Sequence, residues 1–114
     1  MKFTFKQIMD DILNKRYDYI PKTEGVYVVT DGNGKILYIG KGVNLKRRIK
    51  QFIYQGYGKG NNHRGGKKLF GLSGWEEFFI EFTECKNARD KEKTMIQNYK
   101  DKHNGDRPFA NKRD

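Results

Sequence analysis

The hydrophobic and polar positions of the chain first indicate three β-strands. Residues 25–30 (GVYVVT) and 35–41 (KILYIGK) are rich in β-branched and aromatic side chains, and the Asp31-Gly32-Asn33-Gly34 segment between them is a strong hairpin signal. Residues 77–85 (EFFIEFTEC) alternate in part between apolar and polar side chains, which predicts a third strand.

The hairpin turn decides which side chains face each other. A symmetric closure pairs Thr30 with Lys35, and counting inward then places Tyr27 directly opposite Tyr38. Directly opposed residues share a face of the sheet, with Cβ atoms about 4.5–5.5 Å apart. We therefore predict two phenol rings in contact on one face of the hairpin.

Apolar residues at helical spacing predict three helices around these strands. The first spans about residues 4–14 and begins with a capping box formed by Thr4 and Gln7. The second follows a capping Asn44, and the third runs from Asn87 to about Lys102. Together the elements predict an α/β fold, with a small, mainly antiparallel three-stranded sheet flanked by helices, and residues 1–114 are expected to form a single domain.

Two of these helices carry a charged residue within their apolar stripe. Arg48 lies three residues after Leu45, and Glu92 lies four residues after Ala88 and four before Ile96. One interpretation is that the two charges pair with each other or reach the edge of the stripe. The other is a shared site for phosphodiester chemistry, in which the carboxylate holds a divalent metal and the guanidinium stabilises the pentacovalent transition state. The neighbouring basic segment and the tyrosine pair favour the second interpretation.

Positive charge is concentrated in the middle of the sequence. The net charge is +10, and the stretch between Asp31 and Glu76 contains ten basic residues and no acidic one, so the rest of the chain is neutral overall. Clustered cations favour a polyanionic partner because binding releases counterions from the phosphates. This favours a nucleic-acid surface over a face that only keeps the protein dissolved. The expected contacts are Lys41, Lys46, Arg47, Lys50, Lys59, Arg64, Lys67 and Lys68.

Other features limit the cellular setting. Cys85 is the single cysteine, which excludes an intramolecular disulfide and a cysteine-based zinc cluster and fits a reducing cytoplasm. The longest apolar runs are a few residues, and Asp10 and Asp11 interrupt any signal-peptide block. We expect a cytoplasmic protein without a membrane partner.

The ordered motifs resemble the GIY-YIG nuclease family. Residues 25–27 (GVY) and 38–40 (YIG) are similar to its two half-motifs, with Val26 in place of isoleucine. The second continues as 41–48 (KGVNLKRR), which resembles the extension into the helix that bears the family's catalytic arginine. Arg48 takes that place, and Arg47 is the less favoured occupant.

Three further segments are similar to parts of the same family. Ala88-x3-Glu92-x3-Ile96 resembles its metal-binding helix, and Pro108-x-x-Asn111 resembles a closing element whose asparagine supports the site. Asn62-His63, in a loop predicted over residues 54–68, is more loosely similar to a loop where many members carry a histidine. The resemblance covers about residues 25–111.

The resemblance implies roles for the phenols. Tyr27 would act as general base or orient the attacking water, with Tyr38 assisting. A phenol has a reference pKa of about 10, so the base role needs a nearby cation or metal. Lys41 can supply that cation, although a plain phosphate contact explains it more simply.

The remaining roles follow from the same family. Arg48 would contact the scissile phosphate through its planar fork. Glu92 would hold one Mg²⁺ or Mn²⁺ that keeps most of its waters. His63 would position the water or protonate the leaving group, or else is a surface histidine. Asn111 would form a hydrogen bond near Glu92 or simply cap a turn.

The expected function is therefore a metal-dependent endonuclease. Water would attack the phosphorus of DNA at one divalent ion, and structured or single-stranded nucleic acid remains an open alternative as substrate. Family members often carry separate DNA-binding domains, for which 114 residues leave no room, so a partner protein that supplies specificity is also open. The alternative function is a non-catalytic nucleic-acid-binding module that uses the basic surface of residues 35–68.

Overall fold

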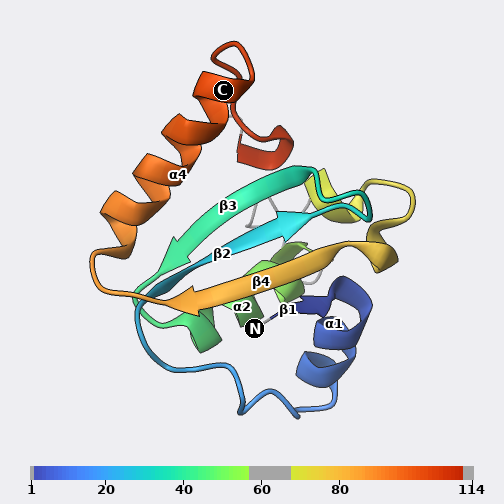
Figure 1. Ribbon diagram of the computed structural model, residues 1–114. Helices are drawn as coiled ribbons and strands as arrows, with labels where there is room; N and C mark the ends of the chain where they lie inside the picture. The colour runs from blue at the N-terminus through green and yellow to red at the C-terminus, as the bar shows by residue number, and fades with distance from the viewer. Residues whose placement is uncertain (1, 57–67, 112–114) are drawn as a thin grey trace.

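A four-stranded antiparallel sheet organises the computed structural model, which describes residues 2–56 and 68–111 (Figure 1). The strands lie in the order β1-β4-β2-β3. Their bounds are β1 Lys2–Thr4, β2 Gly25–Thr30, β3 Ile36–Gly42 and β4 Phe79–Glu84. The three predicted strands and the α/β class are confirmed, and β1 is an additional strand. Three residues are too few to show alternation, and β1 exists because it pairs with β4.

The helices begin close to the capping residues that the sequence indicates. Their bounds are α1 Phe5–Leu13, α2 Leu45–Gly56 and α4 Ala88–Lys102, with short 3₁₀ turns η1 Trp75–Glu77 and η2 Phe109–Asn111. The Thr4 hydroxyl accepts a hydrogen bond from the Gln7 amide at 3.1 Å, and the Asn44 side chain accepts one from the Arg47 amide at 3.0 Å. These contacts satisfy amide groups that a helix start otherwise leaves unpaired.

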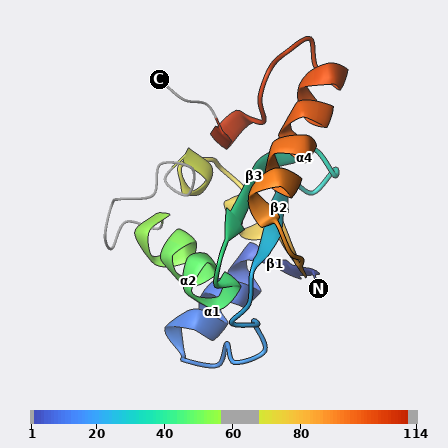
Figure 2. The same cartoon turned by 90° about the vertical axis from the view of Figure 1, so that its left-hand side faces the viewer.

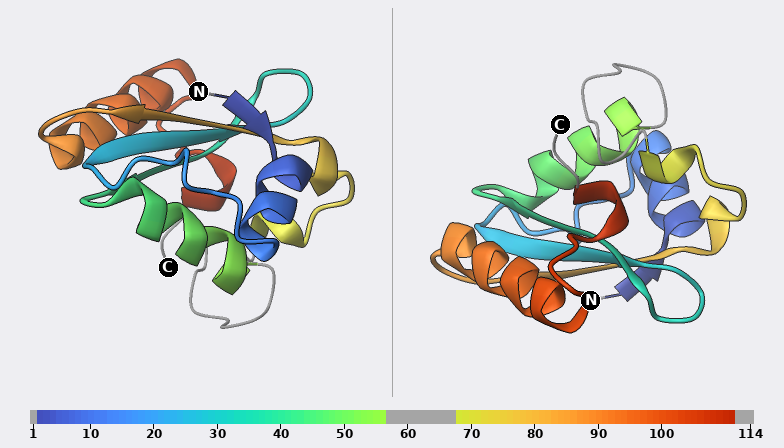
Figure 3. Two further views of the ribbon diagram at one scale, coloured as in Figure 1. Left: turned by 90° about the horizontal axis from the view of Figure 1, so that it is seen from below. Right: turned by 90° about the horizontal axis from the view of Figure 1, so that it is seen from above.

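The sheet separates two layers of helices. Figures 2 and 3 show α1 and α2 on one face and α4 on the other. The main core lies on the α1–α2 face, where aliphatic and aromatic side chains of both helices meet those of β2 and β4. Its fully buried members include Phe5, Ile8, Leu45, Ile49, Phe52, Val29 and Ile80. None of the helices in residues 2–56 and 68–111 has the length and apolar content needed to cross a bilayer.

The hairpin register differs from the symmetric closure. Tyr27 pairs with Gly40 and Val29 with Tyr38, and a bulge follows Val29 so that Thr30 pairs with Ile36. The predicted direct opposition of Tyr27 and Tyr38 is therefore wrong. The offset amounts to two positions, and since side chains alternate with period two, both rings still point to the same face.

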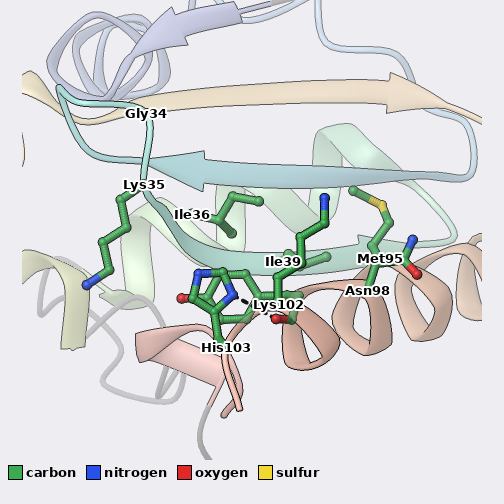
Figure 4. A pocket seen from close by; sticks show the side chains of 9 residues that line it. Gly34, Lys35, Ile36, Ile39, Met95, Asn98, Lys102 and His103 are labelled. Carbon is green, nitrogen blue, oxygen red and sulfur yellow. Dashed lines mark hydrogen bonds between the residues drawn. The ribbon is translucent and has the colours of Figure 1, made fainter. Parts of the chain in front are cut away.

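Helix α4 buries only Ala88 and Tyr99 of its fifteen residues. A cavity of about 360 Å³ remains between the start of β3 and the C-terminal half of α4 (Figure 4). Met95 and Tyr99 line it from the helix, and Ile36 and Ile39 line it from the strand. None of the predicted catalytic residues with a described position lines this cavity.

Candidate active site

The two tyrosines of the hairpin lie side by side beneath α2. Their ring centroids are 5.9 Å apart, and Phe52 of α2 packs against both rings at 5.4 and 5.3 Å. Tyr27 is completely buried. Its ring crosses Gly40 so closely that a Cβ added there would lie 2.5 Å from the Tyr27 Cζ. The glycine of the YIG segment therefore leaves room for the tyrosine of the GVY segment.

The Tyr27 hydroxyl is an unusual buried group. It forms no hydrogen bond of good geometry with any residue in the described ranges. Burial raises its pKa well above the ordinary value, Tyr38 raises it further, and the Arg48 guanidinium opposes the rise. Tyr27 thus keeps its proton at neutral pH.

Tyr38 connects residues from both helical layers. Burial raises its pKa, the positive charge of Arg48 lowers it, and the negative charge of Glu92 raises it. Arg48 belongs to α2 and Glu92 to α4, on opposite faces of the sheet. Arg48 therefore acts on both phenols, whereas Glu92 acts on Tyr38.

Arg48 occupies the inward side of α2. It is half-buried, whereas Arg47 is exposed. A Cβ added at Gly42, the last residue of β3, would lie 2.7 Å from the Arg48 Cβ. The absence of a side chain at Gly42 lets the stem of Arg48 pack against the strand, which points the guanidinium toward the phenols.

Glu92 is half-buried in a cavity of about 600 Å³ beside α4. Arg48 and Glu92 form no ion pair with each other. The Glu92 carboxylate has no hydrogen-bond or ion-pair partner among residues 2–56 and 68–111. The sequence allowed an ion pair between Arg48 and Glu92 as one interpretation, and the structure does not contain that ion pair. The cavity also contains Lys41, Arg89, Lys93, Ile96, Gln97, Lys100 and Arg107.

Asn111 secures the free edge of the sheet. Its side-chain oxygen accepts a hydrogen bond from the Ile39 amide at 2.8 Å, and its side-chain nitrogen donates one to the Ile39 carbonyl at 2.8 Å. The amide group thus replaces the neighbouring strand that β3 lacks on this side. This contact with the strand is not the turn cap that the sequence offers as one alternative. It holds the backbone between Tyr38 and Gly40.

Comparison with known proteins agrees with this arrangement. A family model described as the GIY-YIG catalytic domain matches residues 23–105. The chain belongs to the GIY-YIG family. Membership supports a nuclease of the GIY-YIG type and endonuclease activity in general.

Relatives of this GIY-YIG domain share its sequence over only a small part of their length. The UvrABC system protein C of Caldicellulosiruptor saccharolyticus is 32% identical over 92 residues, which cover 81% of this chain and 15% of that protein. The UvrABC system protein C of Ruminiclostridium cellulolyticum is 32% identical over 85 residues, covering 75% of this chain and 13% of that protein.

GIY-YIG nucleases are generally dependent on a divalent metal. Within the described part of the chain no group of three or more His, Cys, Asp or Glu side chains could enclose an ion. Glu92 is the one carboxylate among the described residues that lines the cavity beside α4, and an ion such as Mg²⁺ can bind through one or two carboxylates while it retains several waters.

The predicted phosphate contacts differ in their availability. Lys41, Arg47 and Lys50 are exposed, and Lys68 is half-buried. Lys46 instead contacts the Asp18 carboxylate at 2.6 Å, with only 17% of its side chain exposed. Counting charge along the sequence missed this pair because Asp18 lies outside the basic stretch. The predicted residues His63, Lys59, Arg64 and Lys67 lie outside the described ranges.

Four cations of the Glu92 cavity were not predicted from the sequence: Arg89, Lys93, Lys100 and Arg107. They belong to a part of the chain whose charges balance when they are counted along the sequence. A helical projection would have found three of them, because their spacing follows that of Glu92 and Ile96 on one side of α4.

Proposed function

We propose that this GIY-YIG domain is a metal-dependent endonuclease that hydrolyses phosphodiester bonds in DNA, with tyrosine-assisted attack of water at one divalent ion. The observation that carries the proposal is the pair of phenols, with ring centroids 5.9 Å apart, beside which Arg48 from one layer and Glu92 from the other both act on Tyr38. A cation, a carboxylate and paired phenols suit the charges that develop when water attacks a phosphodiester.

Tyr27 orients the attacking water in this mechanism. Because burial keeps the phenol protonated, we favour this role over that of general base. The Tyr27 hydroxyl forms no hydrogen bond with the described residues, so its bonding capacity is available to the attacking water once substrate is bound. Tyr38 assists, since its ring lies next to Tyr27 and it is the phenol that both charged residues influence.

Arg48 and Glu92 supply the charged groups. The Arg48 fork binds the scissile phosphate and stabilises its additional negative charge in the transition state. Glu92 would hold Mg²⁺ or Mn²⁺, which would supply Lewis-acid polarisation of the phosphate. Asn111 acts through Ile39, by fixing the strand that carries Tyr38, and is a positioning residue.

Nicking of supercoiled plasmid tests the proposal. Wild type in Mg²⁺ should convert the plasmid to nicked or linear forms, and a chelator should stop the conversion. Glu92→Gln should abolish cutting, while DNA binding stays equal or tightens slightly because a negative charge is removed. Asp90→Asn is the matched control, since Asp90 is an exposed carboxylate on the same helix that does not line the cavity.

The outcomes separate the enzyme from a binding module. Cutting that resists the chelator would overturn metal dependence, and cutting by Glu92→Gln at the wild-type rate would remove Glu92 from its role. Plasmid that is bound but never cut would instead support a non-catalytic module that uses the basic surface of residues 35–68.

A further inference from the structure

The cavity around Glu92 has a strong excess of positive charge. Lys41 from β3, three residues of α4 and Arg107 place five cations around one carboxylate, and the α4 residues are Arg89, Lys93 and Lys100. None of the five forms an ion pair with a carboxylate in the described ranges. Such mutual repulsion weakens a fold unless an anion offsets it.

The cations of α4 lie along one side of the helix. Arg89, Lys93 and Lys100 follow helical spacing, and Glu92 lies between the first and the last of them. The acidic residues Asp90 and Asp101 of the same helix do not line the cavity. The positive and negative charges of this segment cancel along the sequence, but on the folded helix three of the cations face the cavity and these two carboxylates do not.

The length of this row suits a nucleic-acid strand. Lys100 lies eleven positions after Arg89, which at 1.5 Å per residue is about 16 Å along the helix axis. Each strand of duplex DNA advances about 3.4 Å per phosphate, so the row spans roughly five phosphates. Lys41 and Arg107 extend the positive surface to the neighbouring strand β3 and to the segment after α4.

We propose that α4 holds the phosphate backbone of the DNA strand that is cut, through Arg89, Lys93 and Lys100, with Lys41 and Arg107 completing the contact. This assignment rests on the proposed function and adds the path of the substrate. The cations offset the repulsion between Glu92 and phosphate, so a carboxylate can lie in a surface that binds a polyanion. The basic stretch of residues 35–68 then becomes a flanking contact.

Salt-dependent binding to a labelled DNA duplex tests the path, measured by fluorescence anisotropy in chelator so that no strand is cut. We compare wild type with Arg89→Gln, Lys93→Gln and the double variant. Lys91→Gln is the matched control, because Lys91 is an exposed cation of α4 outside the cavity. Each cavity cation removed should reduce the slope of log affinity against log salt by about 0.9.

In affinity terms the effect is measurable. Raising the salt from about 50 to about 200 mM weakens DNA binding by a certain factor in wild type. That factor should be about 3.5-fold smaller for each cavity cation removed, and Lys91→Gln should lose affinity as wild type does. Thermal denaturation separates this role from a structural one, because removing unpaired repelling charges should leave the melting temperature unchanged or raised. Equal slope changes in Lys91→Gln and Arg89→Gln would overturn the α4 path.

This test is independent of catalysis. If plasmid is never cut but the cavity variants alone lose salt-dependent binding, the enzyme proposal fails, and α4 stands as a contact for the DNA backbone but not for a strand that is cut. If cutting is metal-dependent but the cavity variants bind as wild type does, the path fails and the enzyme proposal stands.

Discussion

The helices α2 and α4 cover opposite faces of one sheet and are built for different tasks. The apolar stripe of α2 is completely closed, and its buried residues are Leu45, Ile49, Phe52 and Ile53. Of the fifteen residues of α4 only Ala88 and Tyr99 are buried, and a cavity remains beneath its C-terminal half. Both helices place one charged residue near Tyr38, but Arg48 is set in a packed layer and Glu92 in an open, polar one.

This difference assigns stability mainly to α2 and binding mainly to α4. A well-packed helix holds a charged side chain in one geometry, which suits contact with a transition state. A partly open helix offers a charged surface to a large substrate. We therefore expect changes in the stripe of α2 to cost stability and changes in the cavity side of α4 to cost binding.

The largest expected effect compares Phe52→Ala in α2 with Ile96→Ala in α4. Phe52 is fully buried and packs against Phe5, Tyr27 and Tyr38, so its removal should lower the free energy of unfolding by about 3–5 kcal/mol. Ile96 is half-buried, and its loss should cost about 1 kcal/mol. Urea denaturation measures both, and similar losses in the two helices would break the comparison.

The second effect compares neighbouring cations of α2. Arg48→Met keeps the apolar stem against Gly42 but removes the guanidinium, so the cleavage rate should fall about 100- to 1,000-fold with little change in unfolding. Arg47→Met removes an exposed charge and should reduce cleavage only slightly. Single-turnover cleavage measures both variants. If Arg47→Met is the slower enzyme, the catalytic arginine is Arg47.

Much of the fold follows from local pattern. The hairpin, the helix starts at Thr4 and Asn44 and the stripe of α2 depend on near neighbours, so the sequence predicts them. The register of the hairpin does not, because the bulge after Val29 depends on how the strands pack. The strand β1 depends on β4, about 75 residues away along the chain, and carries no signal of its own.

The site was predictable in its residue types but not in its surroundings. Motif spacing singled out Tyr27, Tyr38, Arg48 and Glu92, and in the structure Arg48 acts on both phenols while Glu92 acts on Tyr38. The Lys46–Asp18 pair and the cations around Glu92 were missed, because charge was counted along the sequence and not over the folded surface. The unpaired hydroxyl of Tyr27 is a property of packing, which no sequence pattern reports.

The third effect concerns the strand edge beside α4. Asn111→Ala removes both hydrogen bonds to Ile39 and should lower the free energy of unfolding by about 1–3 kcal/mol. Asn111→Asp keeps an acceptor for the Ile39 amide but sets a carboxylate oxygen against the Ile39 carbonyl oxygen, so it should be at least as destabilising as Asn111→Ala. Chemical denaturation gives the series. If Asn111→Ala is as stable as wild type, the hydrogen bonds between Asn111 and Ile39 do not stabilise the β3 edge of the sheet.

The smallest expected effect is a gain in stability, from Tyr27→Phe. The change removes a buried hydroxyl without a partner, so at pH 8 the free energy of unfolding should rise by about 1 kcal/mol while cleavage falls. The pKa of Tyr27 is raised in the native state above its unfolded value of about 10, so the native state binds the proton more tightly. Ionisation of Tyr27 therefore does not affect the free energy of unfolding of wild type below pH of about 10. Above that pH the unfolded state loses the proton first, and the wild-type free energy of unfolding falls.

The pH dependence sharpens the contrast between the two helices. The advantage of Tyr27→Phe over wild type should grow above pH of about 10, because only wild type must keep a phenol protonated beneath the closed stripe of α2. Tyr99→Phe on α4 is the control: its ring is also largely buried, but it borders the open cavity under that helix. Denaturation curves at several pH values measure both differences. If the advantage of Tyr27→Phe stays constant with pH, the Tyr27 hydroxyl is solvated in the folded protein. The layer under α2 is then not closed to water.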